Sequence, residues 1–226
     1  MRKNKPLLNK ILSFLIPITI FKQNSTVNTS IEITWNNGQL VMDSKNTNYS
    51  YGSLQRILRK GLQSIGFEKI KTMDSILVLG VAGGSIIKTL VNEINFKGEI
   101  IGVEIDPEII SIANSYFKLN EIPNLTIIIE DAYKHVQKSN KTYDLIIIDI
   151  FQDNSMPEFL FETVFIENLS SLLHLGGYLL FNTMINSKAD QERNKQYLTH
   201  FNTTEFTTYS LPKVEVYNEL IIVRRD

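Results

Sequence analysis

The sequence predicts an α/β fold built on a mostly parallel β-sheet with an antiparallel edge strand, preceded by a small N-terminal β-hairpin module. From about residue 53 onward, apolar runs typical of doubly buried strands alternate with segments of helical spacing. This alternation indicates a parallel sheet covered by helices on both faces. Residues 17–48 are instead rich in Thr, Asn, Ile and Val. We therefore expect an N-terminal segment and β module over residues 1–50 and the main domain over residues 51–226.

The N-terminal module rests on a hairpin signal. Residues 31–35 and 39–42 alternate in hydropathy on either side of Asn36-Asn37-Gly38, and Asn and Gly accept the positive φ that a tight hairpin turn requires. Ahead of it, Arg2, Lys3 and Lys5 precede an apolar run over residues 11–21. The run is too short to span a bilayer and no small-residue cleavage site follows it. We expect a packed helix and a first strand here, and no membrane partner.

The main domain is predicted to begin with a helix, because Leu54, Ile57, Leu58, Leu62 and Ile65 have helical spacing. Five apolar runs then predict strands buried on both faces, at residues 76–79, 100–103, 125–129, 145–148 and 178–181. A helix over residues 107–119 starts at a proline, whose fixed φ suits a first helical position. The last strand, residues 220–223, follows residues 206–211 too closely for a helix, which suggests an antiparallel hairpin at a sheet edge.

Composition excludes several classes of protein. The chain has 226 residues, of which 43% are hydrophobic and 21% are charged, as in soluble globular proteins. Lys and Arg (23) nearly balance Asp and Glu (24), which argues against a nucleic-acid partner. There is no cysteine, so disulfides and thiolate metal sites are excluded, and a cytoplasmic location is expected. The three histidines lack metal-ligand spacing, and we expect no metal.

The predicted strand ends carry the candidate chemistry, because ligands of such sheets bind outside the carboxyl ends of the strands. The first strand runs into a stretch of small residues and then a helix from about Ile86; the stretch is Gly80-Val81-Ala82-Gly83-Gly84-Ser85. Small residues allow a tight turn and a close approach of a ligand to the backbone, and the helix start offers free N–H groups. A purely structural turn is the alternative.

The second strand ends at Glu104, at an offset from Gly80 where a carboxylate accepts hydrogen bonds from the ribose hydroxyls of a nucleoside. Asp106 stands immediately before Pro107, and we favour a helix N-cap for it. The third strand ends near Asp131 and Ala132. A carboxylate beside a backbone amide can bind an adenine edge, and a cap for a helix over residues 132–137 is an equal alternative.

The fourth strand ends at Asp149, with Asp153 nearby. A carboxylate at the end of a central strand can orient or deprotonate an amine nucleophile; a solvated loop acid is the alternative. Four such motifs, each at a predicted strand end and in sequence order, arise by chance much more rarely than any one of them alone.

Together these motifs resemble the spermidine synthase-like members of the class I methyltransferase superfamily, most clearly over residues 50–185. The stretches that carry the resemblance are residues 76–85, Val103-Glu104-Ile105-Asp106-Pro107, Glu130-Asp131-Ala132 and residues 143–149. The resemblance implies a Rossmann-like class I methyltransferase sheet, a donor that is S-adenosylmethionine or its decarboxylated form, no metal, and a homodimer through the β module. It assigns the donor to Gly80, Ala82, Gly83, Gly84, Glu104, Ile105, Asp131 and Ala132, and preparation of a small-molecule amine acceptor to Asp149.

The acceptor site departs from the family pattern. True spermidine synthases carry an Asp where this chain has Gly83, and their Gln and Asp-Glu pair are missing from residues 46–52. In this region Tyr49 and Tyr51 either line the acceptor pocket or pack the hairpin on the main domain, and Asp153 is a further candidate. Three functions stay open: aminopropyl or related alkyl transfer to an amine, methyl transfer from S-adenosylmethionine, and nucleoside binding without turnover.

Overall fold

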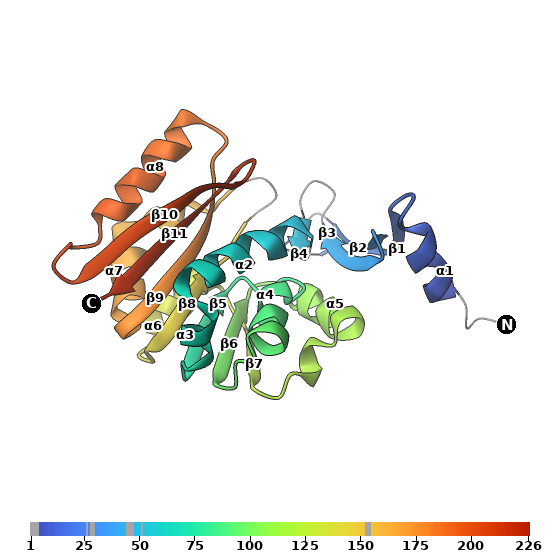
Figure 1. The fold of residues 1–226 in the computed structure, drawn as a ribbon, viewed down its shortest axis with the longest axis horizontal. Helices are drawn as coiled ribbons and strands as arrows, with labels where there is room; N and C mark the ends of the chain where they lie inside the picture. Colours follow the sequence, from blue (N-terminus) through green and yellow to red (C-terminus); the bar gives the residue numbers. More distant parts are fainter. Residues whose placement is uncertain (1–4, 26, 28–29, 44–47, 51, 152–154) are drawn as a thin grey trace.

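A seven-stranded sheet forms the centre of the main domain in the computed structural model, which describes the chain except residues 1–4, 26, 28–29, 44–47, 51 and 152–154 (Figure 1). Its strands are β5 (Ser75–Leu79), β6 (Glu99–Glu104), β7 (Leu125–Ile129), β8 (Tyr143–Ile148), β9 (Leu173–Met184), β10 (Phe206–Glu215) and β11 (Asn218–Arg225). Their order is β10-β11-β9-β8-β5-β6-β7. The five strands from β5 to β9 are parallel, and β11 is antiparallel to both β9 and β10. This confirms the predicted sheet and its antiparallel hairpin.

The strand order reverses at β5. The chain moves outward from β5 to β6 and β7, and then crosses back to β8 on the other side of β5. Open α/β sheets bind ligands at such a reversal, outside the carboxyl ends of the strands. The four predicted strand-end motifs follow β5, β6, β7 and β8, so the topology gathers them at one edge of the sheet.

One predicted strand is less buried than expected. Residues 125–129 were predicted to be buried on both faces, yet Thr126 and Ile129 are exposed in β7. The reason is position, because β7 is the last strand of the sheet and pairs only with β6. By contrast, all five residues of the central strand β5 are buried.

Helices cover both faces of the sheet. They are α2 (Ser53–Ile65), α3 (Phe67–Lys71), α4 (Ser85–Lys88), α5 (Pro107–Phe117), α6 (Ala132–Lys138), α7 (Thr163–Ser171) and α8 (Lys188–Thr199), with shorter helical turns η1 (Thr89–Glu93), η2 (Leu119–Glu121) and η3 (Glu158–Phe161). Alternate residues of β5 belong to two separate hydrophobic layers. Val78 packs with residues of α2 to α5, and Leu77 packs with residues of α6 to α8. This alternation follows from the two-residue period of a strand.

A second, four-stranded antiparallel sheet forms the N-terminal module. After α1 (Lys5–Leu12) come β1 (Ile18–Gln23), β2 (Ile31–Asn36), β3 (Gln39–Asp43) and β4 (Asn48–Ser50), paired in that order. Asn37 and Gly38 form the predicted turn with φ of 48° and 75°, so the hairpin is confirmed. Ile33 and Met42 share a buried core with α2, and the Phe21 ring lies 5.4 Å from that of Tyr116 in α5. The domain boundary near residue 50 stays a prediction.

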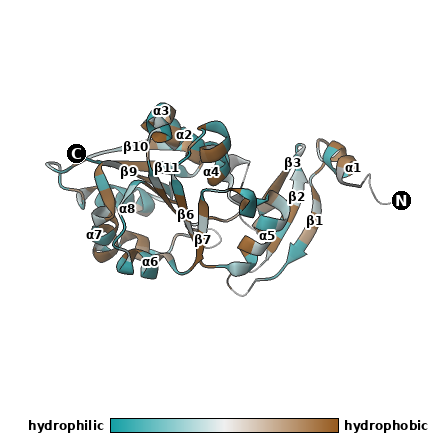
Figure 2. Cartoon of the chain, turned by 90° about the horizontal axis from the view of Figure 1, so that it is seen from below, coloured by the Kyte–Doolittle hydropathy of each residue, from teal (hydrophilic) through white to brown (hydrophobic). Residues whose placement is uncertain are grey.

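The helix and first strand expected at the N-terminus are present, but the helix is not packed. Leu7, Leu8 and Ile11 of α1 are all more than half exposed, and Figure 2 shows hydrophobic residues on this helix. Among the residues described, no helix is both long enough and apolar enough to traverse a bilayer.

Candidate functional site

A pocket opens at the carboxyl ends of β5, β6, β7 and β8, where the strand order reverses. It is lined by Val27, Leu54, Gly80, Ala82, Val103, Glu104, Ile105, Ile109, Glu130, Asp131, Ala132, Asp149, Ile150, Phe151, Pro157 and Phe159. Seven of the predicted site residues are therefore brought together: Gly80, Ala82, Glu104, Ile105, Asp131, Ala132 and Asp149. The other two predicted donor residues, Gly83 and Gly84, are buried in the same loop and do not line the pocket.

The loop after β5 needs small residues because its backbone adopts positive φ angles and because neighbouring atoms leave no room for side chains. Gly80 has φ of +87°, and a Cβ at this position would lie 2.3 Å from the carbonyl oxygen of Asp149. A side chain would therefore push the ends of β5 and β8 apart. Gly84 precedes α4 with φ of +76°, and a Cβ there would meet Leu119 at 2.4 Å. Ala82 adopts a positive φ of 46° without being a glycine. Close packing thus sets the shape of the loop that forms one wall of the pocket.

Glu104 ties this loop to the end of β6. Its Oε2 accepts hydrogen bonds from the backbone N–H groups of Val81 and Ala82, both at 3.0 Å. Its Oε1 accepts from those of Ile105 at 3.0 Å and Asp106 at 3.2 Å. Burial raises the pKa of Glu104, while these backbone donors oppose the rise. Sequence reasoning missed this structural role, because it depends on the folded path of the loop.

Two carboxylates cap helices, as their sequence positions suggested. Asp106 accepts from the backbone N–H groups of Glu108 and Ile109 at the start of α5, so the favoured N-cap interpretation is confirmed. Asp131 accepts from the backbone N–H of Lys134 at 3.0 Å and caps α6. Asp131 also lines the pocket, so the cap and a ligand contact do not exclude each other. Its contact with adenine stays a prediction.

Asp149 lies half-buried in the pocket wall, next to Gly80. The Nδ2 of Asn182 donates to its Oδ1 at 2.9 Å, and the Nδ2 of Asn218 donates to the Oδ1 of Asn182 at 3.0 Å. The second bond fixes which end of the Asn182 amide faces Asp149, so Asp149 receives a donor and not an acceptor. Burial raises the pKa of Asp149 to about 6, against the lowering effect of the Asn182 hydrogen bond.

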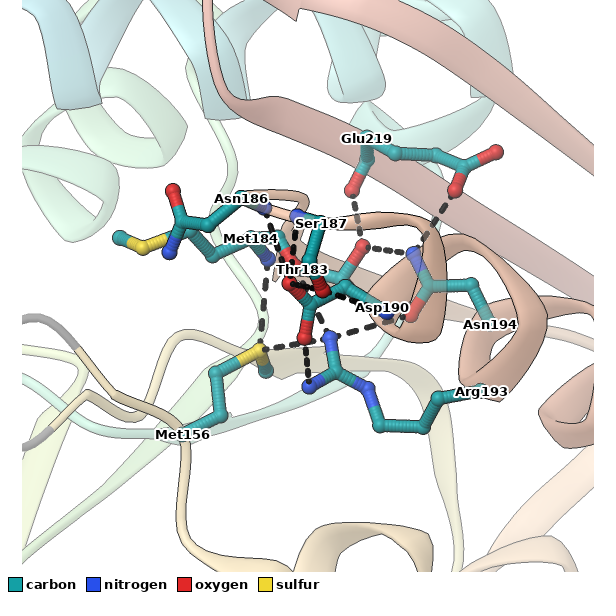
Figure 3. Close-up of polar contacts among 9 residues, drawn as sticks. All are labelled: Met156, Thr183, Met184, Asn186, Ser187, Asp190, Arg193, Asn194 and Glu219. Atoms are coloured by element: carbon teal, nitrogen blue, oxygen red, sulfur yellow. Dashed lines mark hydrogen bonds and ion pairs between the residues drawn. The ribbon is translucent and has the colours of Figure 1, made fainter.

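Asn182 is a site residue that was not predicted from the sequence. It directly follows the fifth apolar run, and Phe181 pairs with Ile148 in the parallel register of β9 and β8. The strand-end reasoning that found Asp149 would therefore also have found Asn182, had it been applied to the fifth strand. The strand end that presents Asn182 is held by α8 (Figure 3). Asn194 of this helix donates to Thr183 and to Glu219, each at 2.7 Å.

The same contact region includes Arg193, which donates to the carbonyl oxygen of Met184 at 2.9 Å and to Asp190 at 2.9 Å (Figure 3). Its guanidinium also lies 4.2 Å from the centre of the Phe161 ring. The bond to Met184 attaches α8 to the carboxyl end of β9, and the contact with Phe161 attaches it to η3.

Apolar side chains make up much of the pocket wall and were not predicted. Ile105 is 44% exposed although it is a large aliphatic residue, because it faces this opening. Phe159 and Pro157 contribute from the segment after β8, and Ile109 from α5. An apolar wall with a few convergent polar groups is the usual composition of a small-molecule site. No motif in residues 155–161 marked that segment in advance.

The predicted acceptor residues are only partly described. Tyr51 and Asp153 lie outside the described residues. Tyr49 belongs to β4, and its side chain is also outside the described part. In the portion of the chain that the structure does describe, no cluster of three His, Asp or Glu side chains is arranged to hold a metal ion.

The fold and the pocket define a Rossmann-like protein of the class I methyltransferase type. The family model of the spermine/spermidine synthase domain matches residues 55–221. The chain belongs to this family.

Similar curated proteins include both aminopropyltransferases and methyltransferases. The polyamine aminopropyltransferase of Vibrio vulnificus is 30% identical over 152 residues, which are 66% of this chain and 50% of the relative. The N-terminal histidine N-methyltransferase of Emericella nidulans is 42% identical over 85 residues, which are 35% of this chain and 15% of the relative. The chain thus spans half or less of the length of these relatives.

Solved structures show the same fold at low identity. A probable spermidine synthase from Corynebacterium glutamicum has a TM-score of 0.72 and 17% identity, covering 92% of this chain and 79% of that one. A spermidine synthase in complex with the transition-state analogue AdoDATO has a TM-score of 0.70 and 17% identity, with coverages of 92% and 73%. Human methyltransferase-like protein 13 in complex with SAH has a TM-score of 0.59 and 20% identity, with coverages of 77% and 79%.

Proposed function

We propose that the chain is a transferase that binds S-adenosylmethionine or decarboxylated S-adenosylmethionine and transfers an alkyl group, in the first place aminopropyl, to a small-molecule amine. The observation that carries this proposal is the position of Asp149 at the wall of the strand-end pocket, with one oxygen held by Asn182. Family membership and the aminopropyltransferase relative support it.

In the proposed donor site, Glu104 binds the ribose, Asp131 and Ala132 bind the adenine, and Ile105 packs on the adenine face. The loop from Gly80 to Gly84 surrounds the sulfonium end. Glu104 already accepts four backbone hydrogen bonds, which equals the number of lone-pair sites on a carboxylate. A ribose hydroxyl must therefore share or replace one of these donors. We infer that donor binding adjusts the loop that Val81 and Ala82 belong to.

In the proposed transfer step, the lone pair of the acceptor nitrogen attacks the carbon next to the sulfonium sulfur. The bond between that carbon and sulfur breaks, and its electron pair stays on sulfur as a neutral thioether. The nitrogen then loses a proton, which Asp149 accepts. With a pKa of about 6, Asp149 is about nine-tenths ionised at neutral pH and is ready to accept it. The pocket contributes the remaining rate acceleration by holding donor and acceptor in line.

Methyl transfer from S-adenosylmethionine is the second candidate, and the buried residue Gly83 favours it. An Asp at this position would place a negative charge near the end of the donor and would repel the carboxylate of S-adenosylmethionine. Gly83 removes that repulsion. The Emericella relative, named as an N-methyltransferase, is consistent with this candidate. The same Asp149 would then accept the proton of the methylated amine.

A calorimetric titration separates the candidates. The full chain is titrated with S-adenosylmethionine, its decarboxylated form and methylthioadenosine, and product formation from putrescine is followed by mass spectrometry. Tighter binding of the decarboxylated form, with product formation that Asp149→Asn abolishes, supports aminopropyl transfer. A preference of tenfold or more for S-adenosylmethionine, which is about 1.4 kcal/mol, favours methyl transfer. Glu104→Ala serves as the donor-site control, and no binding of any compound contradicts both candidates.

The remaining expectations are also proposals. We propose a homodimer through the N-terminal β module, an amine acceptor and not a nucleic acid as the partner, and a cytoplasmic location. The near balance of charge and the absence of cysteine support the last two.

A further inference from the structure

The N-terminal segment exposes a continuous series of large apolar side chains. Seven residues between positions 7 and 16 have exposed fractions from 40% to 81%; they are Leu7, Leu8, Ile11, Leu12, Phe14, Leu15 and Ile16. The four within α1 lie within about 140° of the helix circumference, at about 100° per residue. Isolated exposed apolar residues are ordinary, but a contiguous apolar patch marks an interaction surface.

This segment is held in a defined position. The side chain of Ser13 is buried, and its Oγ accepts a hydrogen bond from the backbone N–H of Gly38 at 2.9 Å. The Ser13 carbonyl oxygen accepts from the backbone N–H of Asn37 at 3.0 Å. The ring of Phe14 packs against Gly38, where a Cβ would lie 2.4 Å from it. The hairpin turn therefore anchors residues 13–14 and presents the apolar patch at the end of the molecule remote from the seven-stranded sheet (Figure 1).

The charge of the same region is strongly one-sided. Residues 1–31 contain five Lys and Arg residues and no Asp or Glu, whereas the whole chain has a net charge of -1; the five are Arg2, Lys3, Lys5, Lys10 and Lys22. Lys22 is paired with Glu32 of β2, which leaves four basic residues at positions 2–10, beside the apolar patch in the sequence. Lys10 is exposed within α1, beside the apolar face. An apolar face flanked by basic residues suits an anionic membrane surface, where the side chains enter the headgroup region and the cations meet lipid phosphates.

We propose that residues 5–16 dock the protein on an anionic lipid surface, with α1 lying in the plane of the interface. This corrects the expectation of no membrane partner, because a segment that lies in the interface needs neither the length of a spanning helix nor a cleavage site. A lipid surface is favoured over a protein groove because the patch lies at a projecting end, includes helix and turn residues alike, and belongs to a segment, residues 1–31, that contains basic but no acidic residues. This inference is independent of the donor and acceptor chemistry, and it requires that the proposed homodimer through the N-terminal β module leaves residues 5–16 uncovered.

Vesicle co-sedimentation of the full chain tests the proposal. We expect binding to vesicles that contain phosphatidylglycerol, weaker binding to pure phosphatidylcholine, and loss of binding at about 1 M salt, where the Debye length falls to about 3 Å. Leu15→Glu combined with Ile16→Glu should weaken binding at least tenfold. Lys10→Gln should weaken binding to the anionic vesicles by about fivefold.

Leu175→Glu is the matched control, because Leu175 is 80% exposed but lies in β9 of the main domain. It should bind vesicles as the unmodified chain does, and thermal unfolding verifies that all variants are folded. Equal binding by the Leu15 and Ile16 variant, or no preference for anionic vesicles, would overturn the proposal. So would a dimer that the same variant converts to a monomer while no vesicle is bound, since the patch would then be a contact between two copies of the chain.

Discussion

Replacing Asp149 by Asn is expected to stabilise the folded chain at neutral pH, although it removes the proposed proton acceptor. Burial raises the pKa of Asp149 from 3.8 to about 6, while the hydrogen bond from Asn182 opposes the rise and the charge of Glu104 adds to it. The ionised carboxylate is therefore less favourable in the folded chain than in the unfolded one. An Asn side chain keeps an oxygen that accepts the same bond from Asn182, but it carries no charge.

The magnitude follows from the shift in pKa. A rise of about two units corresponds to about 3 kcal/mol at full ionisation, since each unit is about 1.4 kcal/mol. Allowing for the polar amide group that the variant leaves in the pocket, we expect a gain of about 2 kcal/mol, or about 4–8 °C in Tm for a chain of this size. Because the folded pKa lies above the unfolded one, this gain is absent below about pH 4, develops as the pH rises to about 6, and is complete above it.

Asp144, at the other end of the same strand, provides a control of opposite sign. Burial favours a higher pKa for Asp144, but hydrogen bonds from His174 and from the backbone of Asp74 and Ser75 outweigh it and lower the pKa. The backbone bonds are both 2.9 Å long. A lowered folded pKa contributes stability that is present at neutral pH and lost in acid. Asp144→Asn should therefore decrease Tm at neutral pH, and most of this decrease should remain near pH 4, because the stabilisation is lost only as the pH falls through the lowered folded pKa, below 3.8.

Thermal unfolding followed by circular dichroism, at about pH 4 and about pH 7.5, measures both effects. The unmodified chain and the two variants are compared at equal ionic strength. If Asp149→Asn lowered Tm at neutral pH, or raised it equally at both pH values, the carboxylate would not be strained by burial and the argument for its raised pKa would be wrong.

Three further outcomes are expected. Gly80→Ala should lower the free energy of unfolding in urea by more than about 3 kcal/mol, because the added Cβ would collide with a carbonyl group. Gly176 has φ of +78° and nothing within 4 Å of an added Cβ, so Gly176→Ala should lower it by only about 1 kcal/mol. Equal losses of stability would contradict the steric explanation. Glu104→Gln should lower the free energy of unfolding by about 2–4 kcal/mol, because its NH₂ group must face backbone N–H donors. It should also weaken donor binding in calorimetry. An unchanged free energy of unfolding would refute the role of those backbone donors. Asn182→Ala removes the donor that lowers the pKa of Asp149, so the acid limb of kcat/KM should move to higher pH, and an unchanged pH profile would exclude a positioning role for Asn182.

Much of the fold could be predicted because its signals are local. The hairpin at Asn37-Gly38 follows from backbone preferences of two residues, and the central strands follow from runs of apolar residues. The exposure of β7 could not be predicted, because Leu125–Ile129 is as apolar as the central strands and only the strand order makes it an edge. A helix was expected at the N-terminus, but its exposure was not predicted. The apolar residues of an amphipathic helix look the same in the sequence whether or not another element of the fold covers them.

The site was predictable where a single strand end supplied the residue. Glu104 and Asp149 each follow an apolar run, and the carboxyl ends of parallel strands meet at one edge. The contact of Asn182 with Asn218 depends on the pairing of β9 with β11, in which Asn182 is opposite Leu220. That register is a tertiary property, and no local pattern in either strand specifies it. The apolar wall around Phe159 likewise depends on how the segment after β8 returns over the pocket.

The hydrogen bonds of two pocket carboxylates, Glu104 and Asp149, also indicate which of them can exchange a proton. Protonation of Glu104 would place a hydroxyl group against backbone N–H donors on either oxygen, so at least one of four hydrogen bonds would break. Protonation of Asp149 on Oδ2 leaves the bond from Asn182 to Oδ1 intact. Because Asn218 holds the Asn182 amide in place, Asp149 can gain and lose a proton without a change in its position. A group that takes up a proton during each turnover needs this property, and of the two carboxylates only Asp149 has it.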